Sequence, residues 1–350
     1  MRRLPIYFLI DISESMIGEP IEQVQGGMAE IIKELRTDPY ALETVFLSVI
    51  VFAGKAQNIV PLTELYKFYP PKFPIGGGTS LGAGLDFLMN DMELNIQKTT
   101  MEVKGDWKPI VFLFTDGAPT DHFESAFNRW NNKFRNQSNL IAVSIGNNLD
   151  ASILGKITNT VLSLNGNDGT TFKKFFKWVT ASIKTSSLSV NESHNDELQL
   201  APIYNGFLSK IDLEKAPPVD KIDDSHAVIL AKCQTKKQLY LIKYEKKFSF
   251  KGDVVLTDPS MHGFKLVGAY PVDNSYFELS DGATSNKVNS SELAGFPCCP
   301  CCGNQYGFSF CSCGKIMCCG EEAQATCPWC GTTAEFGFGG GHIDISRTRG

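Results

Sequence analysis

The feature that most constrains the fold is a repeated alternation of short apolar runs with amphipathic patterns in the first half of the chain. The apolar runs are rich in β-branched and aromatic residues and predict strands at residues 5–10, 45–53, 110–115, 140–145 and 160–164. Between them, apolar side chains recur at helical spacing, which predicts helices over residues 21–35, 81–92, 123–134 and 172–183. Apolar strands alternating with helices are typical of a mostly parallel sheet covered on both faces. We therefore predict an α/β, doubly wound domain over residues 1–190.

Two local patterns refine this prediction. Residues 55–60 are expected to return as an antiparallel edge strand beside the strand at 45–53. Asp150 and Asp168 precede two predicted helices and are candidate N-caps.

Three loops of this domain carry side chains with hard oxygen donors. DISES (11–15) follows the first strand, GGGTS (76–80) enters the second helix, and TDG (115–117) ends the third strand. Taken alone, each loop is more typical of a helix cap or a turn. Ligands gather at the carboxyl ends of strands in an open parallel sheet, so the three loops together predict one site. The candidate ligands are Asp11, Ser13, Ser15, Thr79 and Asp116.

This all-oxygen donor set suits a six-coordinate Mg²⁺ or Mn²⁺ ion. Because most of the donors are neutral hydroxyls, the cation would keep affinity for one further ligand, such as a carboxylate from a protein partner. A hydrolytic site would need a base beside the cation, and the only nearby histidine, His122, is expected at an exposed helix start. A phosphate-binding GxxxxGK[ST] loop is absent. The pattern favours binding over catalysis.

DISES, GGGTS and FTDG resemble the three elements of the metal-ion-dependent adhesion site of the von Willebrand factor type A domain. The resemblance covers the whole of the predicted α/β domain. It implies that Ser13, Ser15 and Thr79 bind the metal directly, and that Asp11 and Asp116 act directly or through water.

The longer run FTDGAPTD (114–121) is similar to the bacterial TerY-like branch of that family. This resemblance raises Asp121 as a residue at the rim of the metal site. The alternative, a cap for the helix beginning near Phe123, is the commoner use of such an aspartate.

Ten of the 11 cysteines fall between Cys298 and Cys330. Such a cluster, in a chain that reads as cytosolic, indicates metal binding rather than disulfides. Two CPxCG turns, at residues 299–303 and 327–331, predict one structural, tetrahedral zinc site. The predicted ligands are Cys299, Cys302, Cys327 and Cys330.

Four cysteines between these turns are candidates for a second zinc site: Cys311, Cys313, Cys318 and Cys319. A crossed pairing also fits, because CSCGKIMCC has the spacing of inner knuckles in RING-like folds. We expect Cys298 and Cys301 to be spare neighbours of ligands, and Cys233 to be a small buried side chain in a strand.

The order of these two regions resembles the tellurite-resistance-associated TerY family, and FCSCGKIMCC and TCPWCG are similar to its C-terminal metal-binding domain. The resemblance implies a component of a bacterial signalling triad that works beside a Ser/Thr kinase and a metal-dependent protein phosphatase. It also implies a link to tellurite resistance or a stress response.

The rest of the chain predicts a β-rich region, linkers and a tail. Strand patterns at 227–234, 238–250, 264–272 and 275–280 predict a β-rich region over residues 207–280. The remaining predicted segments are linkers at 191–206 and 281–297, a zinc-ribbon-like cysteine module at 298–335 and a tail at 336–350.

Charge and hydropathy limit the partners. The formal charge of −5 disfavours nucleic acid, because phosphate binding usually needs a basic face. No apolar run reaches the length of about 18 residues that a membrane-spanning helix needs. We predict a cytoplasmic, non-enzymatic, metal-dependent protein-interaction module that contacts neither nucleic acid nor membrane. The alternatives are a RING-like ubiquitin-ligase component and a transcription or repair scaffold.

Overall fold

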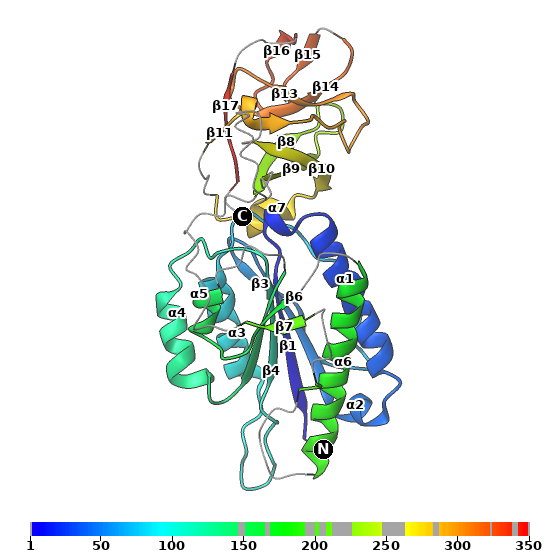
Figure 1. The fold of residues 1–350 in the computed structure, drawn as a ribbon, viewed down its shortest axis with the longest axis vertical. Coiled ribbons are helices and arrows are strands. Elements are labelled where there is room, and N and C mark those ends of the chain that lie inside the picture. The colour runs from blue at the N-terminus through cyan, green and yellow to red at the C-terminus, as the bar shows by residue number, and fades with distance from the viewer. Residues whose placement is uncertain are drawn as a thin grey trace, which may run out of the picture. The chain divides into compact units, whose positions relative to one another are not determined.

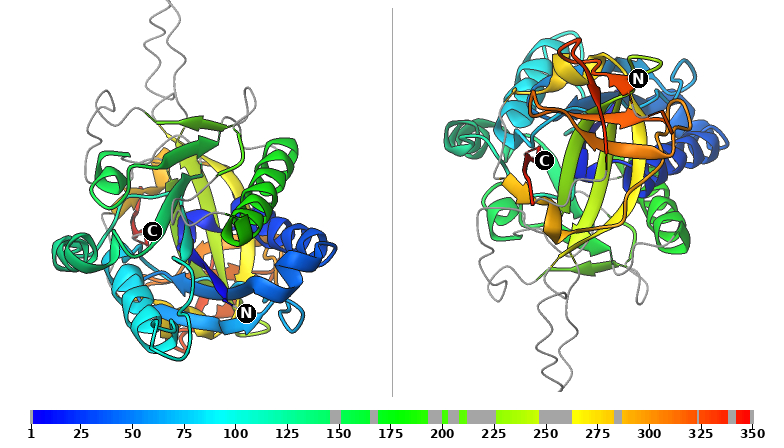
Figure 2. Two further views of the ribbon diagram at one scale, coloured as in Figure 1. Left: turned by 90° about the horizontal axis from the view of Figure 1, so that it is seen from below. Right: turned by 90° about the horizontal axis from the view of Figure 1, so that it is seen from above.

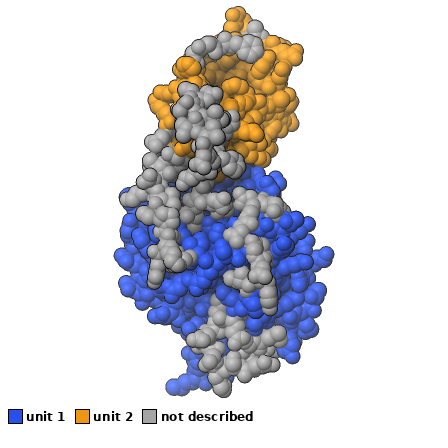
Figure 3. Space-filling view, in the orientation of Figure 1, with its two compact units in different colours: residues 1–73, 79–221 blue, residues 74–78, 222–350 orange. Residues whose placement is uncertain are grey.

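The structure is a computed structural model of the 350-residue chain and divides into two compact units, which Figure 3 colours separately. Unit 1 comprises residues 1–73 and 79–221, and unit 2 comprises residues 74–78 and 222–350. The described residues are 2–145, 151–164, 169–192, 200–202, 208–211, 226–246, 263–282, 287–322, 324–337 and 342–348. The candidate caps Asp150 and Asp168, and most of the linker predicted at 191–206, lie outside these residues.

Unit 1 is built on a seven-stranded sheet with the order β3-β2-β1-β4-β5-β6-β7. The five inner strands run parallel, and the edge strands β3 and β7 are antiparallel to their neighbours. The strands are β1 (Leu4–Asp11), β2 (Val45–Phe52), β3 (Ala56–Glu64), β4 (Ile110–Thr115), β5 (Asn139–Ser144), β6 (Val161–Leu164) and β7 (Leu208–Lys210). The mostly parallel sheet and the β2–β3 hairpin predicted from the sequence are confirmed. The short strand β7 was not predicted.

Helices cover both faces of this sheet, as Figures 1 and 2 show. Helices α1, α2 and α6 lie on one face, and α3, α4 and α5 lie on the other. Their bounds are α1 (Glu19–Leu35), α2 (Pro39–Thr44), α3 (Leu81–Asn95), α4 (Glu124–Arg129), α5 (Ala151–Gly155) and α6 (Gly169–Glu192), with a π-helical turn at Trp130–Phe134 after α4. The four predicted helices are present. The short helix α2 was missed because it contains too few turns to show a period, whereas α5 begins directly after Asp150, where a helix was predicted.

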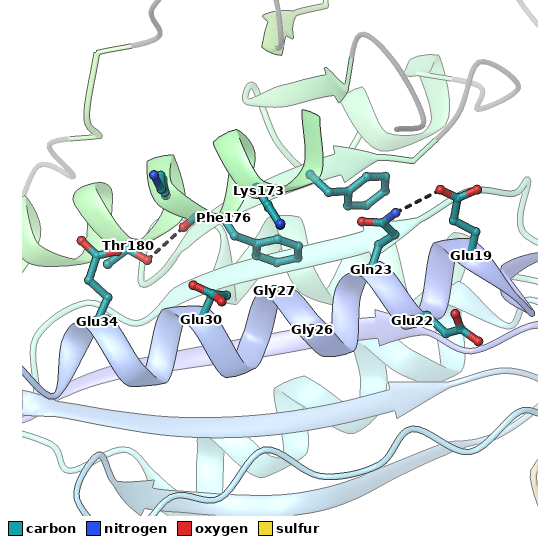
Figure 4. A pocket seen from close by; sticks show the side chains of 12 residues that line it. Glu19, Glu22, Gln23, Gly26, Gly27, Glu30, Glu34, Lys173, Phe176 and Thr180 are labelled. Carbon is teal, nitrogen blue, oxygen red and sulfur yellow. Dashed lines mark hydrogen bonds between the residues drawn. The ribbon is translucent and has the colours of Figure 1, made fainter. Parts of the chain in front are cut away.

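Helices α1 and α6 approach each other closely at Gly27. A Cβ atom on Gly27 would lie 1.9 Å from ring carbons of Phe176, so only glycine leaves room for that ring. The neighbouring Gly26 faces open space, because a Cβ atom added there would have no atom within 4 Å. Beside this contact lies a groove of 490 Å³, shown in Figure 4, with glutamates on its α1 wall and Lys173 and Lys177 on its α6 wall.

Unit 2 contains a six-stranded sheet with the order β12-β10-β9-β8-β14-β13. Its strands are β8 (His226–Lys232), β9 (Leu239–Lys246), β10 (Phe264–Val272), β12 (Leu293–Ala294), β13 (Tyr306–Phe310) and β14 (Ile316–Cys319). Two small sheets pair β11 (Lys287–Asn289) with β17 (Asp344–Ser346), and β15 (Gln324–Thr326) with β16 (Thr333–Glu335). Within the described residues of this unit, the remaining elements are the helix α7 (Ser275–Leu279) and a 3-10 turn at Ser290–Glu292.

The boundaries predicted within this unit differ from the structure. Strand β14, from the cysteine-rich region, pairs directly with β8, so the predicted β-rich region and cysteine module share one sheet. The predicted linker at 281–297 contains β11 and β12, and the predicted tail contains β17, whose Ile345 is buried. These strands were missed because two or three residues are too few to show an alternating pattern.

The strand predicted at 275–280 is the helix α7. The cause is local, because Oδ1 of Asp273 accepts a hydrogen bond from the backbone N–H of Ser275 at 3.0 Å and so starts a helical turn. Among the described residues, no helix combines the length and the apolar character needed to cross a lipid bilayer.

Candidate metal centres

The oxygen-donor loops lie at the middle of the sheet in unit 1. Asp11 is the last residue of β1, and Asp116 follows the last residue of β4. These two strands are parallel neighbours, and the chain runs outward from them to opposite edges of the sheet. This is the topological switch point at which open α/β sheets bind ligands, because the loops on its two sides turn away from each other.

Three of the predicted ligands form a continuous chain of oxygen atoms. Oγ of Ser13 lies 3.0 Å from Oγ of Ser15, and the Ser15 hydroxyl donates a hydrogen bond to Oδ1 of Asp116 at 2.8 Å. Adjacent ligands of an octahedral Mg²⁺ ion, each about 2.1 Å from the metal, lie about 3.0 Å apart. The spacing therefore fits a small hard cation, and it is also that of ordinary hydrogen bonds.

Asp11 holds the DISES loop in shape. Its Oδ1 accepts a hydrogen bond from the backbone N–H of Ser13 at 2.9 Å, and its Oδ2 accepts one from the Thr115 hydroxyl at 2.6 Å. Burial raises the pKa of Asp11 to about 6, while these hydrogen bonds oppose the rise. With both oxygens in use, Asp11 supplies negative charge behind the hydroxyls of the loop.

Thr79 joins the cluster from the loop that precedes α3. A Cβ atom placed on Gly117 would lie 3.8 Å from Oγ1 of Thr79 and 3.9 Å from Oγ of Ser15, so the three residues are neighbours. Thr79 and Thr120 exchange two hydrogen bonds: Thr79 N–H donates to Oγ1 of Thr120, and Thr120 N–H donates to the Thr79 carbonyl, both at 2.9 Å. The structure thus brings all five predicted residues together, and we call Asp11, Ser13, Ser15, Thr79 and Asp116 the oxygen cluster. Sequence reasoning missed the positioning role of Thr120.

Asp121 caps a helix, but not the predicted one. Its carboxylate accepts hydrogen bonds from the backbone N–H groups of Gly82 at 3.3 Å and Ala83 at 3.0 Å, in the first turn of α3. Ser80, at the N-cap position of α3, makes no such bond with its own side chain. Asp121 therefore ties the TDGAPTD loop to the helix that follows Thr79.

Eight of the cysteines form two groups of four. Within each group, the sulfur atoms all lie within 4.8 Å of one another. The buried thiol cluster consists of Cys233, Cys299, Cys302 and Cys318. The surface thiol cluster consists of Cys311, Cys313, Cys327 and Cys330. The prediction that the two CPxCG turns bind one ion together is therefore wrong, because the structure places each turn in a different cluster. The observed arrangement is the crossed pairing that was given as the alternative.

The sulfur spacing fits zinc. Sulfurs bound at about 2.3 Å to a tetrahedral Zn²⁺ ion lie about 3.8 Å apart. In the buried thiol cluster, Sγ of Cys302 and Sγ of Cys318 are 3.7 Å apart. In the surface thiol cluster, the Cys311–Cys330 and Cys313–Cys327 pairs are each separated by 3.8 Å. A disulfide would need about 2.05 Å, so these thiols are unbridged.

Cys233 is a ligand candidate that the sequence analysis assigned to packing. It starts a turn with the same hydrogen bonds as the two CPxCG turns. Cys233 N–H donates to the Gln238 carbonyl and Lys237 N–H donates back to the Cys233 carbonyl, as in the pairs Cys299–Asn304 and Gly303–Cys299. Lys237, with φ of 56°, takes the left-handed position that Gly303 and Gly331 take in the other turns. The sequence feature that could have identified Cys233 as a ligand is its position directly before a hairpin turn as long as the CPxCG turns.

Cys319 belongs to neither group, although the sequence analysis placed it beside Cys318 in a second site. Successive side chains of a strand point to opposite faces, and both residues lie in β14. Cys318 packs into the core around Ile229 and Tyr240, whereas Cys319 packs with Met317 and Ala325 on the other side. A paired-cysteine doublet in a strand therefore cannot supply both thiols to one ion.

Backbone N–H groups point at the sulfurs of the buried thiol cluster. Gln234 N–H donates to Sγ of Cys318 and Lys236 N–H to Sγ of Cys233, each at 3.2 Å. Burial raises the pKa of Cys318, and hydrogen bonds lower the pKa of Cys302 to about 7 against the effect of its burial. Such N–H donors stabilise metal-bound thiolates.

Cys301 and Cys298 lie next to ligand candidates in the sequence but are not ligand candidates themselves. Burial and the neighbouring thiolates of Cys299 and Cys233 raise the pKa of Cys301 to about 12, so Cys301 stays protonated. Cys298 is exposed. Neither residue belongs to the two clusters.

Comparison with known proteins gives the same two regions. A family model for the von Willebrand factor type A domain matches residues 6–177, and a model described as the TerY-C metal binding domain matches residues 223–350. Inter-alpha-trypsin inhibitor heavy chain H1 from Bos taurus is 27% identical over 118 residues, covering 33% of this chain and 13% of that protein. The same protein from Sus scrofa is 26% identical over 119 residues, with the same coverage. The chain thus spans 13% of the length of these curated relatives.

Some solved structures align with about half of the chain. Crystal form 2 of proximal thread matrix protein 1 from the mussel byssus has 18% identity and a TM-score of 0.40, covering 52% of this chain and 48% of that one. The open conformation of the pilus adhesin SpaC from Lactobacillus rhamnosus GG has 13% identity and a TM-score of 0.42, covering 52% of this chain and 30% of that one. By the family models, the chain combines a region that matches the von Willebrand factor type A domain, at residues 6–177, with one that matches the TerY-C metal binding domain, at residues 223–350.

Proposed function

We propose that this chain is a non-enzymatic scaffold or regulator that binds a protein partner through a cation in its oxygen cluster. A von Willebrand factor type A domain joined to a TerY-C metal binding domain supports a metal-related protein-interaction module. The observation that carries the finer proposal is the run of oxygens from Ser13 through Ser15 to Asp116, with the spacing that adjacent ligands of Mg²⁺ or Mn²⁺ require.

The donor chemistry favours binding of an acidic group. Ser13, Ser15 and Thr79 are neutral donors, so the cation keeps positive charge that a partner's carboxylate would balance. Asp11 and Thr120 position these donors through the hydrogen bonds described above. When bound, the metal supplies one coordination position for the partner.

The two thiol clusters are proposed to hold one Zn²⁺ ion each. Four thiolates fill a tetrahedral zinc site and leave no open position for a substrate, which makes a structural role the natural one. The buried thiol cluster takes Cys233 from the β8–β9 turn and Cys318 from β14. It thereby links the two parts of the six-stranded sheet of unit 2.

The identity of the partner rests on the order of the domains alone. Because the chain resembles TerY-type proteins, we propose that a Ser/Thr kinase and a metal-dependent protein phosphatase are its partners in a bacterial signalling triad. A role in tellurite resistance or a stress response belongs to the same proposal.

The crossed order of the thiol clusters favours one second candidate, the RING-like ubiquitin-ligase component. Along the chain, the pairs Cys299–Cys302 and Cys327–Cys330 flank the inner cysteines and belong to different clusters. A ubiquitin discharge assay with a charged conjugating enzyme separates the candidates, because a scaffold does not accelerate discharge.

Asp116→Asn tests the oxygen cluster. Calorimetric titration of Mg²⁺ and Mn²⁺ into the full chain should show an affinity loss of about 100-fold or more, because even groups outside the ligand shell contribute about 10–100-fold. The free energy of unfolding of unit 1 should fall by no more than about 1 kcal/mol, because Oδ1 of asparagine can still accept the Ser15 hydrogen bond. The matched control is Asp38→Asn at the N-cap of α2, where asparagine caps as well as aspartate.

Partner binding is tested by affinity capture from the native host with added Mg²⁺, without it, and after its return. Capture of the kinase or phosphatase that depends on Mg²⁺ and is lost with Asp116→Asn supports the proposal. Equal capture by wild type and Asp116→Asn in all three conditions contradicts it.

A further inference from the structure

The two thiol clusters differ in their access to solvent. In the surface thiol cluster, Cys313 and Cys330 are exposed, while Cys311 and Cys327 are buried. In the buried thiol cluster, none of the four thiols is exposed, and only Cys302 is partly accessible. A dissolved reagent therefore has more access to the surface thiol cluster than to the buried thiol cluster.

The clusters also differ in what surrounds them. The surface thiol cluster is held by the short β15–β16 hairpin and a small apolar group in which Cys311, Cys327 and Met317 are members. The buried thiol cluster lies in a larger core formed by strands β8, β9 and β10. Local opening at the surface thiol cluster thus exposes little apolar surface and costs less free energy.

Two lysines lie beside the exposed turn of the surface thiol cluster. The amino groups of Lys232 and Lys315 are 5.2 Å and 5.7 Å from the ring centre of Trp329, the residue that precedes Cys330. Trp329 is itself fixed, because its Nε1–H donates to the Ile316 carbonyl at 2.8 Å. These contacts place two cations beside the ordered turn that carries Cys330.

We propose that the surface thiol cluster is a site of thiol oxidation, at which hydrogen peroxide converts Cys311 and Cys330 to a disulfide and releases zinc, while the buried thiol cluster keeps its ion. This inference rests on the zinc occupancy proposed above. The Cys311–Cys330 and Cys313–Cys327 pairs each join an exposed to a buried cysteine at 3.8 Å, and we assign the reaction to the first pair because Lys232 and Lys315 lie beside Trp329, next to Cys330.

The reaction has two steps. The Cys330 thiolate attacks one oxygen of hydrogen peroxide, the O–O bond breaks, and the departing hydroxide takes a proton to form water, which leaves a sulfenic acid on Cys330. The Cys311 thiolate then attacks that sulfur, the S–O bond breaks, and the hydroxide takes a second proton. Two thiolates lose two electrons in total and one peroxide becomes two waters. A zinc ion left with two thiolates dissociates.

The test uses the full chain loaded with zinc. Zinc is counted by native mass spectrometry before any oxidant is added, with two ions per chain expected. Hydrogen peroxide is then added in the presence of a chromogenic zinc chelator, and the free thiols are alkylated and mapped by peptide mass spectrometry. We expect about half of the zinc to be released in a first phase, together with a Cys311–Cys330 disulfide and protected thiols at Cys233 and Cys299.

Two variants sharpen the test. Cys330→Ser should bind one zinc ion and lose the first release phase. Cys298→Ser, which removes an exposed thiol of neither cluster, should behave as wild type.

The outcomes separate the two proposals. Fewer than two zinc ions before oxidation contradict the proposed zinc occupancy itself. Two ions that leave at one rate, a disulfide among the buried cluster's cysteines, or oxidation of Cys298 with no zinc release overturn the oxidation proposal while leaving the zinc sites in place.

Discussion

The candidate metal sites of the two units differ in their position relative to the apolar core. In unit 1 the oxygen cluster lies at the ends of strands whose core is apolar, with side chains such as Leu9, Phe52 and Trp130 fully buried. In unit 2 both apolar clusters contain candidate ligands, Cys299 and Cys318 in one and Cys311 and Cys327 in the other. A cation that binds at the edge of a complete apolar core can dissociate without unfolding it, whereas an ion bound within the core contributes to the folding free energy.

The largest effect that this comparison predicts comes from Cys233→Ser. The substitution removes the ligand that the β8–β9 hairpin gives to the buried thiol cluster. Structural zinc contributes about 10–16 kcal/mol in small zinc peptides, so losing one ligand should destabilise unit 2 by several kcal/mol. Zinc stoichiometry and the thermal unfolding of unit 2 measure the effect.

The matched control for this variant is Cys301→Ser, which makes the same change at a buried thiol of the same core that is not in the cluster. It should cost about 1–3 kcal/mol, the range for a buried polar group without a partner, and leave the zinc content unchanged. Equal zinc loss in both variants would show that Cys233 is not a ligand.

A smaller effect is expected from substitutions in α1 that change the stability of unit 1 without involving a metal site. Gly27→Ala places a methyl group 1.9 Å from the ring of Phe176 and should destabilise unit 1 by about 1–3 kcal/mol through overpacking. Gly26→Ala, one position away in the open groove of Figure 4, should stabilise it by up to about 1 kcal/mol, because alanine favours the helix.

Both glycine variants are measured by denaturant unfolding with and without zinc and magnesium. The account expects the same shifts in every condition, since packing of α1 on α6 involves no ligand. Shifts that appear only in the metal-loaded protein would mean that metal supports the core of unit 1.

The sequence predicted unit 1 well because its signals are long and local. Strands such as β1 and β4 are apolar up to their last residue, and α1 and α6 show several helical periods. The positions of DISES and FTDG at the ends of these strands then placed the oxygen donors at one edge of the sheet. What sequence missed there, the Thr79–Thr120 pairing and the capping of α3 by Asp121, depends on contacts between distant loops.

Unit 2 was harder because its organisation depends on non-local pairing. Cys233 lies far from the other cysteines in the sequence and meets them only when β8 pairs with β14. The doublet Cys318–Cys319 is divided between two faces of a strand, which spacing alone does not show. The strands at 287–289 and 344–346 are too short to show an alternating apolar pattern, and they form by pairing with each other.

Hydrogen–deuterium exchange on the full chain tests the contrast between the units most directly. Three samples are compared: fully loaded, without magnesium, and with zinc removed under reducing conditions. The account predicts that omitting magnesium raises exchange only near residues 11–17, 79–80 and 115–121, and that removing zinc raises it throughout β8, β9 and β14 while β1, β2 and β4 keep their protection. Protection of β8 and β14 that survives zinc removal, or loss of protection in β1 and β4 without magnesium, would contradict it.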